Sequence, residues 1–578
     1  MLAGKFITKQ INSSDNFPTN RSNPLKMKKL ICFLFLLSVT VISTFAQNDV
    51  KTKGLGAITP DAVKGQLEFL ASDWTEGRAT GEKGGFIAAD YIMSMFKVYG
   101  IQPAGDMNSD EFTMRRRRRE TTPVQPRTRS YFQDFELVDY SPGDEQLMSI
   151  ISSDGTSKKS MTFNNRTDFT VRTGDVGFEI EAPVVFVGYG VVDKKNNYDD
   201  YKDMNVKGKI ILRLSGFPGF KDTASVAYKK FKPENNYTFQ NAKDKYAEEN
   251  GAVAVIEYNP TGNLRRSWVS NYPLRYNTPT YEGDKPLNSN VSRMRIPGDT
   301  LNSSLVNLSV TSRCIVELLK GTGIDLARYD ELVKTQMKPA SKSLAGKSIF
   351  LKTTVKSRLI KARNVVGMIE GENPNEIVMI GGHYDHLGTV NGFIFNGADD
   401  NASGTVGVMT VAKAIAATGI KPKRTIIFAA WTGEEKGLLG SDYWVDYVGL
   451  DKKVVFYMNF DMIARNATTD SAGIKCGFTY TKAYKQLQEF TENNAKDYKI
   501  GLDIKYTGEE RPTGGSDFTA FSIKNIPVIE VMAAMHPDYH QYTDEVSKVN
   551  FPKMTNIIRL GFLDIWDIAN MPEKLVKE

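Results

Sequence analysis

The four histidines of this 578-residue chain lie in two short motifs, His383-Tyr-Asp-His386 and His536-Pro-Asp-Tyr-His540. The acidic residues between these motifs that accompany apolar, strand-like runs are Asp399, Asp400, Glu434, Glu435 and Asp461. Imidazole and carboxylate groups are ligands that divalent transition metals prefer. The pattern therefore predicts a metal site that is assembled from several separate segments of the chain.

Two imidazoles and three carboxylates make up the predicted ligand set: His383, Asp400, Glu435, Asp461 and His540. Such a set suits two zinc-like ions that lie about 3.5–4 Å apart. A carboxylate in the loop before a helix can bridge two cations with one oxygen on each. We choose Asp400 for this place, with Asp399 as the alternative. Each acid alone also has an ordinary explanation, because acidic residues at a helix start interact favourably with the helix dipole.

Residues beside the predicted ligands can assist them. Asp385 lies two positions after His383, so on a strand end both side chains point the same way and the carboxylate can orient the imidazole. Of the adjacent glutamates Glu434 and Glu435, one can bind metal while the other takes a proton from water. The hydroxyl of Tyr539 can donate a hydrogen bond to a developing oxyanion.

Alternating strands and helices between residues 345 and 578 must position these side chains. The apolar, β-rich runs are Ile377–Ile380, Thr425–Ala430, Val454–Asn459 and Ile526–Val531. The stretches with helical periodicity are Ser403–Ala417, Leu438–Tyr447, Tyr484–Lys496 and Met554–Ile568. This alternation predicts an α/β fold with a mostly parallel sheet and helices on both faces. In such sheets ligands bind beyond the carboxyl ends of the strands, where the predicted ligands fall.

The part of the chain before residue 345 divides into further segments. Residues 55–135 are predicted to contain two helices, broken at Gly77–Gly85, and an insertion at 107–130 whose composition favours disorder. Residues 136–320 have short β-rich runs and no histidine, so we expect a separate, non-catalytic module there. We place the main catalytic domain at residues 321–578.

Residues 27–46 have the pattern of a secretory signal peptide. Lys28 and Lys29 precede an apolar stretch that ends at Ala46, a small residue suited to cleavage before Gln47. The apolar stretch is short for a permanent membrane helix, so we expect no stable membrane anchor. We expect Met27 to be the true start, and an exported protein that is periplasmic or secreted in a Gram-negative-type bacterium.

The formal charge of +7 is concentrated in a few places. Residues 1–46 carry six Lys or Arg and one Asp, and Arg115–Arg119 form a single basic run. The rest of the chain is close to neutral, so we expect no nucleic-acid partner. Beyond the signal peptide only Cys314 and Cys476 remain, which is too few for a disulfide scaffold or a thiolate zinc site, although the two can still pair.

Five sequence motifs resemble those of the co-catalytic dizinc aminopeptidases, the family that includes bacterial secreted leucine-type aminopeptidases. In order along residues 345–578 they are GGHYDHLG, GADDNASG, WTGEEKGLLGS, NFDMIAR and DYHQYTDE. The segments FVGYGVVDKKNNYDDY and VKGKIILRL are similar to those of a protease-associated domain. The resemblance implies that this domain, at 136–320, is inserted into a split zinc peptidase domain.

The resemblance implies two zinc ions per chain and a role for each site residue. His383 and Asp461 would hold one ion, Glu435 and His540 would hold the other, and Asp400 would bridge them. Glu434 would be the general base, Tyr539 would assist the oxyanion, and Asp385 would orient His383. Some relatives have an arginine before a Ser-Asp pair, whereas here Gly514-Gly515 precede Ser516-Asp517, which leaves the substrate contacts open.

We therefore expect a secreted metallo-aminopeptidase that acts on peptides with a free N-terminus. The alternatives are a carboxypeptidase on the same scaffold, a glutaminyl cyclase with a single zinc, and a receptor-type protein built on an inactive peptidase domain. All five predicted ligands are present, which disfavours the last. The sequence leaves the side-chain preference and the oligomeric state open.

Overall fold

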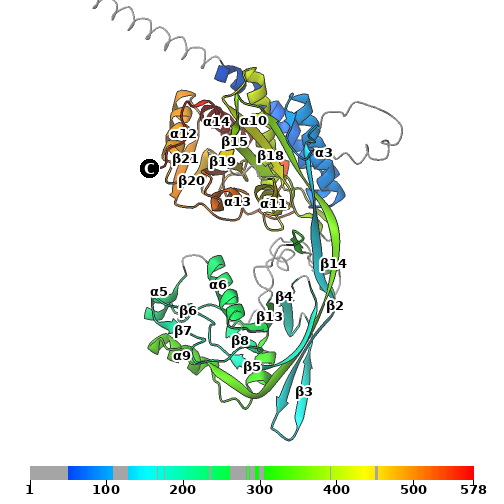
Figure 1. The fold of residues 1–578 in the computed structure, drawn as a ribbon, viewed down its shortest axis with the longest axis vertical. Helices are drawn as coiled ribbons and strands as arrows, with labels where there is room; N and C mark the ends of the chain where they lie inside the picture. Colours follow the sequence, from blue (N-terminus) through cyan, green and yellow to red (C-terminus); the bar gives the residue numbers. More distant parts are fainter. Residues whose placement is uncertain are drawn as a thin grey trace, which may run out of the picture.

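The structure is a computed structural model, shown in Figure 1. It describes residues 50–107, 128–260 apart from 166, 173, 175, 234 and 235, the short stretches 281–282, 285–286 and 293–298, 305–448 apart from 391, and 453–578. The signal peptide predicted at 27–46 and almost all of the insertion predicted at 107–130, including Arg115–Arg119, lie outside the described residues. Within these ranges no helix is both long and apolar enough to cross a membrane.

One hydrogen-bonded sheet connects most strands of the chain, in the order β21-β20-β22-β19-β15-β18-β14-β5-β8-β9-β13-β4. In chain order these strands are β4 (Phe169–Arg172), β5 (Phe178–Phe186), β8 (Ile210–Leu214), β9 (Ala254–Tyr258), β13 (Val306–Val310), β14 (Lys342–Ile369), β15 (Asn373–His383), β18 (Arg424–Trp431), β19 (Val454–Phe460), β20 (Lys475–Thr481), β21 (Asp503–Glu509) and β22 (Val528–Met532). The strands β1 (Gln102–Pro103), β2 (Phe132–Ser153), β3 (Lys158–Phe163) and β12 (Arg293–Arg295) pair alongside this path.

The upper part of Figure 1, which we call the upper half, contains α2, α3 and the elements from β15 onward. Its helices are α2 (Pro60–Leu70), α3 (Lys83–Val98), α10 (Gly404–Thr418), α11 (Leu439–Tyr447), α12 (Gln486–Asp497), α13 (Phe518–Ile523) and α14 (Phe551–Asn570). Strands β18, β15, β19 and β22 run parallel to one another, whereas β14 joins β18 and β20 joins β22 in antiparallel pairs. The predicted α/β class with a mostly parallel sheet is confirmed.

Side chains alternate between two cores on the faces of this sheet. Val378 and Ile380 of β15 pack in the core that includes α2, α3, α10 and α14. Ile377 and Met379 of the same strand pack in the core that includes α11 and α13. This period of two explains why the strand is an unbroken apolar run, since both faces are covered by helices.

Helix boundaries in the upper half follow local capping rules. The side chain of Thr59 accepts a hydrogen bond from the backbone N–H of Ala62 and precedes Pro60, so α2 begins there. The helix α10 ends where Gly419 takes the left-handed conformation with φ of 68°. The helices predicted in this half all occur, with shifted ends.

A long two-stranded ribbon, β2 with β14, runs between the two parts of the molecule in Figure 1. The antiparallel register extends from Lys347↔Ser152 to Val365↔Phe132. The C-terminal end of β14, Val365–Ile369, pairs with β18, and its N-terminal end, from Lys342 to Thr353, pairs with β5. The strand β14 therefore belongs to both parts and connects their sheets.

The lower half of Figure 1 is built on the parallel strands β5, β8, β9 and β13. Its helices are α5 (Val226–Phe231), α6 (Asn236–Glu249), α8 (Ser312–Leu319) and α9 (Leu326–Gln336). Two further cores lie on the faces of these strands. Cys314 and Cys476 are both buried free cysteines, and they lie in cores of different halves. The domain boundaries at 135/136 and 320/321 remain predictions.

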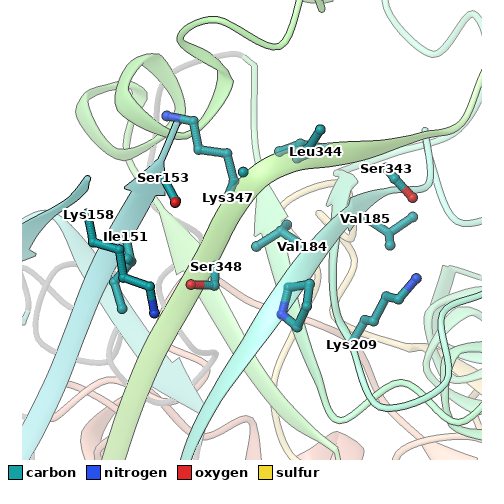
Figure 2. Close-up of a pocket in the computed structure, with 13 residues that line it drawn as sticks. Ile151, Ser153, Lys158, Val184, Val185, Lys209, Ser343, Leu344, Lys347 and Ser348 are labelled. Carbon is teal, nitrogen blue, oxygen red and sulfur yellow. The ribbon is translucent and has the colours of Figure 1, made fainter. Parts of the chain in front are cut away.

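A hollow with a volume of about 320 Å³ lies between β5 and β14 in the lower half. It occurs where the register of this strand pair shifts between Ser343 and Ser348. Figure 2 shows Lys158, Lys209 and Lys347 around Val184 at this place. None of the predicted site residues lines this hollow, and all of them lie in the upper half.

Candidate metal centre

The five predicted ligands meet at the carboxyl ends of the parallel strands of the upper half. His383 is the last residue of β15, and Asp461 directly follows β19. Glu435 lies in the turn after β18, and His540 lies in the loop after β22. Asp400 lies in the short turn η3 (Ala398–Ser403), which leads into α10. Their convergence follows from the parallel topology, because parallel strands present their carboxyl ends at one edge.

One group of potential ligands consists of His383, Glu434 and Asp461, whose ligand atoms lie within 4.8 Å of one another. The Nε2 atom of His383 lies 3.5 Å from Asp461 Oδ1 and 3.8 Å from Glu434 Oε2. The same nitrogen lies 3.5 Å from Asp400 Oδ1. The imidazole of His383 thus faces three carboxylates.

A second group consists of His386, Asp400 and Glu435. The Nδ1 atom of His386 lies 2.7 Å from Glu435 Oε1. The Nε2 atom of His540 lies 3.0 Å from Asp400 Oδ2 and 3.2 Å from Glu435 Oε2. The two oxygens of Asp400 therefore face different imidazoles, His383 and His540, as expected of a carboxylate between two cation positions.

The charges of this centre depend strongly on one another. Burial alone would lower the pKa of His540, but Glu435 and Asp400 beside it raise that pKa to about 10. Burial would raise the pKa of Glu435, but His540 and His386 hold it well below its usual range. Carboxylates out of water need a nearby cation, and a metal ion would take the place of the protons on the imidazoles.

Glu434 differs from its neighbour. Its side chain is 10% exposed, and burial raises its pKa well above the usual value, with Glu435 and Asp461 adding to the shift. The backbone N–H of Glu434 donates a hydrogen bond of 3.2 Å to Asp385 Oδ1. Glu434 thus lies within the first group of potential ligands and favours the protonated form when no cation is present.

Asp385 contacts the ligands through its backbone and its side chain. The Nδ1 atom of His383 lies 3.1 Å from the backbone oxygen of Asp385. A carbonyl oxygen only accepts, so Nδ1 carries the proton and the lone pair of Nε2 faces the carboxylates. The carboxylate of Asp385 lies 3.7 Å from the same Nδ1 and accepts hydrogen bonds from elsewhere. Orientation of His383 through the Asp385 side chain remains a prediction.

Tyr539 packs its ring on the imidazole of His540, with ring centroids 3.8 Å apart. Burial raises the pKa of Tyr539, and the carboxylates of Asp400 and Glu435 raise it further. The hydroxyl therefore keeps its proton and can donate it in a hydrogen bond.

Two further contacts at the centre were not predicted. His386, in the same motif as His383, contacts Glu435, and its membership in that motif was the available signal. Asp544 accepts hydrogen bonds of 3.0 Å from the backbone N–H groups of both Asp399 and Asp400. Asp399, the alternative to Asp400, instead lies 3.2 Å from His536 and accepts from Ala464, so Asp400 is the residue that joins the potential ligands.

Parts of the sequence of this chain are similar to those of known peptidases. Residues 364–561 match the model of peptidase family M28. The chain is 37% identical to leucine aminopeptidase 2 of Trichophyton equinum over 172 residues, which is 28% of this chain and 32% of that protein. It is 31% identical to a probable leucine aminopeptidase 2 of Aspergillus fumigatus over 211 residues, 36% of this chain and 38% of that protein. The chain thus spans less than half the length of the curated relatives it matches.

Among solved structures, the aminopeptidase from Aneurinibacillus sp. strain AM-1 is similar with a TM-score of 0.53 and 18% identity. The similarity covers 91% of this chain and 98% of that one, and it shows a shared fold. Both groups of potential ligands lie inside residues 364–561. The candidate metal centre therefore lies within the segment that matches the model of peptidase family M28.

Proposed function

We propose that the protein is a secreted metallo-aminopeptidase that removes the N-terminal residue from peptides with a free N-terminus. The observation that carries this proposal is the pair of ligand groups at the strand ends, with Asp400 between His383 and His540. The names of the curated relatives, leucine aminopeptidase 2, support an action on peptide N-termini.

The residues of the centre fit two zinc ions. The donors are nitrogen and oxygen only, and Asp461 Oδ1 is buried without a hydrogen-bond partner. His383 and Asp461 would hold one ion, Glu435 and His540 the other, and Asp400 would lie between them. When bound, two zinc ions polarise the peptide carbonyl and lower the pKa of water from about 15.7 to about 7.

Glu434 acts as the general base in this proposal. It takes a proton from the water that attacks the peptide carbon, and a carbon–oxygen bond forms. It then gives that proton to the amide nitrogen as the carbon–nitrogen bond breaks, so the amine leaves neutral and the new carboxyl remains on the released residue.

Tyr539 and His386 have supporting parts. The Tyr539 hydroxyl donates a hydrogen bond to the carbonyl oxygen as negative charge develops on it. His386, through its contact of 2.7 Å, fixes the carboxylate of Glu435 so that its other oxygen faces His540. The carboxylate of Asp385 accepts a hydrogen bond from the backbone N–H of Glu434 and so holds the backbone at Glu434 in place.

Paired substrates and metal analysis test the function. We expect hydrolysis of leucine anilide and of peptides with a free N-terminus, no hydrolysis of their N-acetylated forms, and two zinc ions per chain. Cleavage of N-acetylated peptides at the C-terminus would instead indicate a carboxypeptidase. One zinc per chain with cyclisation of N-terminal glutamine would indicate a glutaminyl cyclase. Two bound zinc ions with no reaction on any of these substrates would contradict all three.

We also propose that residues 136–320 form a protease-associated domain and that the protein is exported, to the periplasm or the medium of a Gram-negative-type bacterium. The segments FVGYGVVDKKNNYDDY and VKGKIILRL support the first statement, and the pattern of residues 27–46 supports the second. N-terminal sequencing of the mature protein tests the second: a first residue of Gln47 fits, and a retained Met27 does not.

A further inference from the structure

A segment far upstream in the sequence contacts the motif His383–His386 and the loop that leads into Asp400. Residues 73–82, which we call the N-terminal clasp, connect α2 to α3 and include the short helix η1 (Asp73–Arg78). The backbone N–H of His386 donates to the backbone oxygen of Arg78 over 3.2 Å. Ala79 also forms an isolated bridge with His386. The clasp therefore lies directly against the motif that contains His383 and His386.

Arg78 is fully buried and donates only to backbone carbonyl oxygens. Its Nε donates to Tyr384 over 2.7 Å, and its Nη2 donates to Gly397 over 2.9 Å. Its Nη1 donates to Asn396 over 2.6 Å and to Leu70 over 2.7 Å. One guanidinium thus joins the strand end beside His383 to the loop that leads into Asp400.

The charge of Arg78 suits this position. Burial lowers the pKa of Arg78 to about 10, while Asp400 and Asp385 favour its charged form, so the group is a cation at neutral pH. Its planar fork of five N–H groups can reach several carbonyl oxygens at once. A lysine ammonium is a point donor with a different reach, so it cannot satisfy the same four carbonyls.

Thr80 extends the contact to the side chains of the centre. Its hydroxyl donates a hydrogen bond of 2.7 Å to Asp385 Oδ2, and both residues are buried. The other oxygen of Asp385 accepts from the backbone of Glu434. A continuous chain of hydrogen bonds therefore runs from the clasp to the proposed general base.

The backbone of the clasp leaves no space for adjustment. Gly77 has φ of 70°, and a Cβ there would lie 2.6 Å from the backbone oxygen of Gly388 and 2.7 Å from that of Phe395. Gly388 and Phe395 belong to the hairpin of β16 (Gly388–Val390) and β17 (Phe393–Phe395). In the sequence this hairpin lies between His386 and the loop that carries Asp400. Only glycine combines this conformation with this close approach.

We propose that Arg78 and Thr80 are positioning residues of the metal centre. Arg78 sets the distance between the strand end that carries His383 and the loop that carries Asp400, and Thr80 fixes the Asp385 carboxylate beside Glu434. This inference rests on the proposed metal site and deepens it. It also means that the centre is complete only when the segment before the inserted module packs on the domain after it.

The substitutions Thr80→Val and Thr80→Ser form the first test. Valine keeps the shape of threonine but removes the hydroxyl, whereas serine keeps the hydroxyl. We expect Thr80→Val to weaken zinc binding at least about tenfold in competition with a chelator, the range typical for loss of an outer hydrogen-bond partner. We expect Thr80→Ser to bind zinc like the parent protein.

The substitution Arg78→Lys, with Arg424→Lys as its matched control, forms the second test. Arg424 is also a buried arginine whose guanidinium donates to three backbone carbonyls, of Ile568, Met571 and Glu573, but it lies at the start of β18, opposite the ligands. We expect Arg78→Lys to weaken zinc binding at least about tenfold and to change the visible absorption of the cobalt-substituted protein. Arg424→Lys should lower the melting temperature and leave both metal readouts unchanged.

The outcomes separate this inference from the proposed function. Zinc binding and hydrolysis by the parent protein, together with unchanged zinc affinity and cobalt spectra in Thr80→Val and Arg78→Lys, would overturn the positioning roles alone. A parent protein that binds no zinc would overturn the proposed function first. If Arg78→Lys does not fold, the comparison of Thr80→Val with Thr80→Ser still decides.

Discussion

Glu434 and Glu435 are neighbours in the sequence with opposite electrostatic surroundings. Two imidazoles, of His386 and His540, keep Glu435 in its charged form, which suits a metal ligand. Burial raises the pKa of Glu434, because the one imidazole beside it, that of His383, is outweighed by burial and by three acidic neighbours, Glu435, Asp461 and Asp517. The turn after β18 thus places two carboxyl groups with opposite pKa shifts at adjacent positions.

The substitution Glu434→Gln should remove hydrolysis and retain the metal. Glutamine keeps the shape of glutamate and cannot take a proton, so kcat should fall by about 10²–10⁴-fold, the usual contribution of a general base. Zinc content by elemental analysis should stay at the level of the parent protein. Glu435→Gln is the control, because it should lose zinc as well as activity. Full activity of Glu434→Gln would falsify the base assignment.

Removal of each of the two histidines that contact Glu435 should affect zinc binding differently. We expect His540→Ala to lower the zinc content to about one ion per chain, since it removes a proposed ligand. We expect His386→Ala to keep both ions at saturating zinc but to bind them about 10–100-fold more weakly, since it removes the hydrogen-bond partner of a ligand. Zinc titrations of both variants check this, and the reverse result would exchange the two roles.

Much of the centre can be predicted at the level of single residues. Scarce histidines and paired acids near strand ends point to His383, Asp400, Glu435, Asp461 and His540, and the structure brings all five together. The contact of His386 with Glu435 was missed, because it depends on how closely the end of β15 and the turn after β18 approach each other. Arg78 was also missed, because it acts on backbone carbonyls more than 300 positions away.

Among the helices, the pair α12 and α14 carries a buried carboxyl group. Asp564 of α14 accepts hydrogen bonds from Thr491 and Asn494 of α12, over 2.8 and 2.9 Å. Burial raises the pKa of Asp564 to about 7, although these bonds oppose the shift. In the unfolded chain this pKa returns to about 3.9. At a pH between these two pKa values, the carboxyl group of Asp564 is protonated in the folded state and charged in the unfolded chain.

This difference gives a pH dependence with a definite sign. Because the folded state binds the extra proton, the free energy of unfolding falls as pH rises from about 4 to about 7. Asp564→Asn removes this contribution, since the asparagine side chain does not titrate and its amide can still form a hydrogen bond with Thr491. We expect the loss of stability between pH 5 and pH 7.5 to be smaller in the variant by at least about 1 kcal/mol.

Urea unfolding of the zinc-free proteins, followed by tryptophan fluorescence, measures this effect. Trp431, Trp444 and Trp566 all lie in the same half as Asp564, so the signal reports the relevant cores. Parent and variant contain the same other titrating groups, so their difference isolates Asp564. Equal slopes with pH in the two proteins would mean that Asp564 is charged in the folded state.

Among the strands that were not predicted is β14, the longest strand of the described structure. Buried and half-buried positions alternate from Lys347 to Thr353, and Asn364–Gly367 are all buried, but Ser357–Ile360 in its middle are exposed or half-exposed on both faces. Apolar and polar residues do not alternate in such a stretch, so its sequence does not predict a strand. Its partner β2 holds it through backbone pairing and through ion pairs such as Arg358 with Asp139.

The whole molecule consists of two halves connected by the ribbon, and a further small core, which includes Leu137 and Ala362 of the ribbon, Met294, and Leu439 of α11, packs where the ribbon meets the upper half. The cores of the upper half and those of the lower half share no residue. The ion pairs of the ribbon are largely exposed, as with Lys356 and Asp144, so each contributes little to stability. The α/β class of the upper half was predictable from local patterns, whereas the continuous sheet depends on pairing between residues about 200 positions apart.

Two separate cores predict two unfolding transitions, and zinc should affect one of them. A ligand that binds only the folded state stabilises the part that binds it. Zinc removal with EDTA should therefore lower the melting temperature of the upper half by several degrees and leave the transition of the lower half unchanged. Four of the five tryptophans, Trp74, Trp431, Trp444 and Trp566, belong to the upper half, and Trp268 lies outside the described residues, so tryptophan fluorescence is weighted toward the upper half while circular dichroism reports both halves. A single transition that shifts as a whole on zinc removal would mean that the ribbon couples the halves into one cooperative unit.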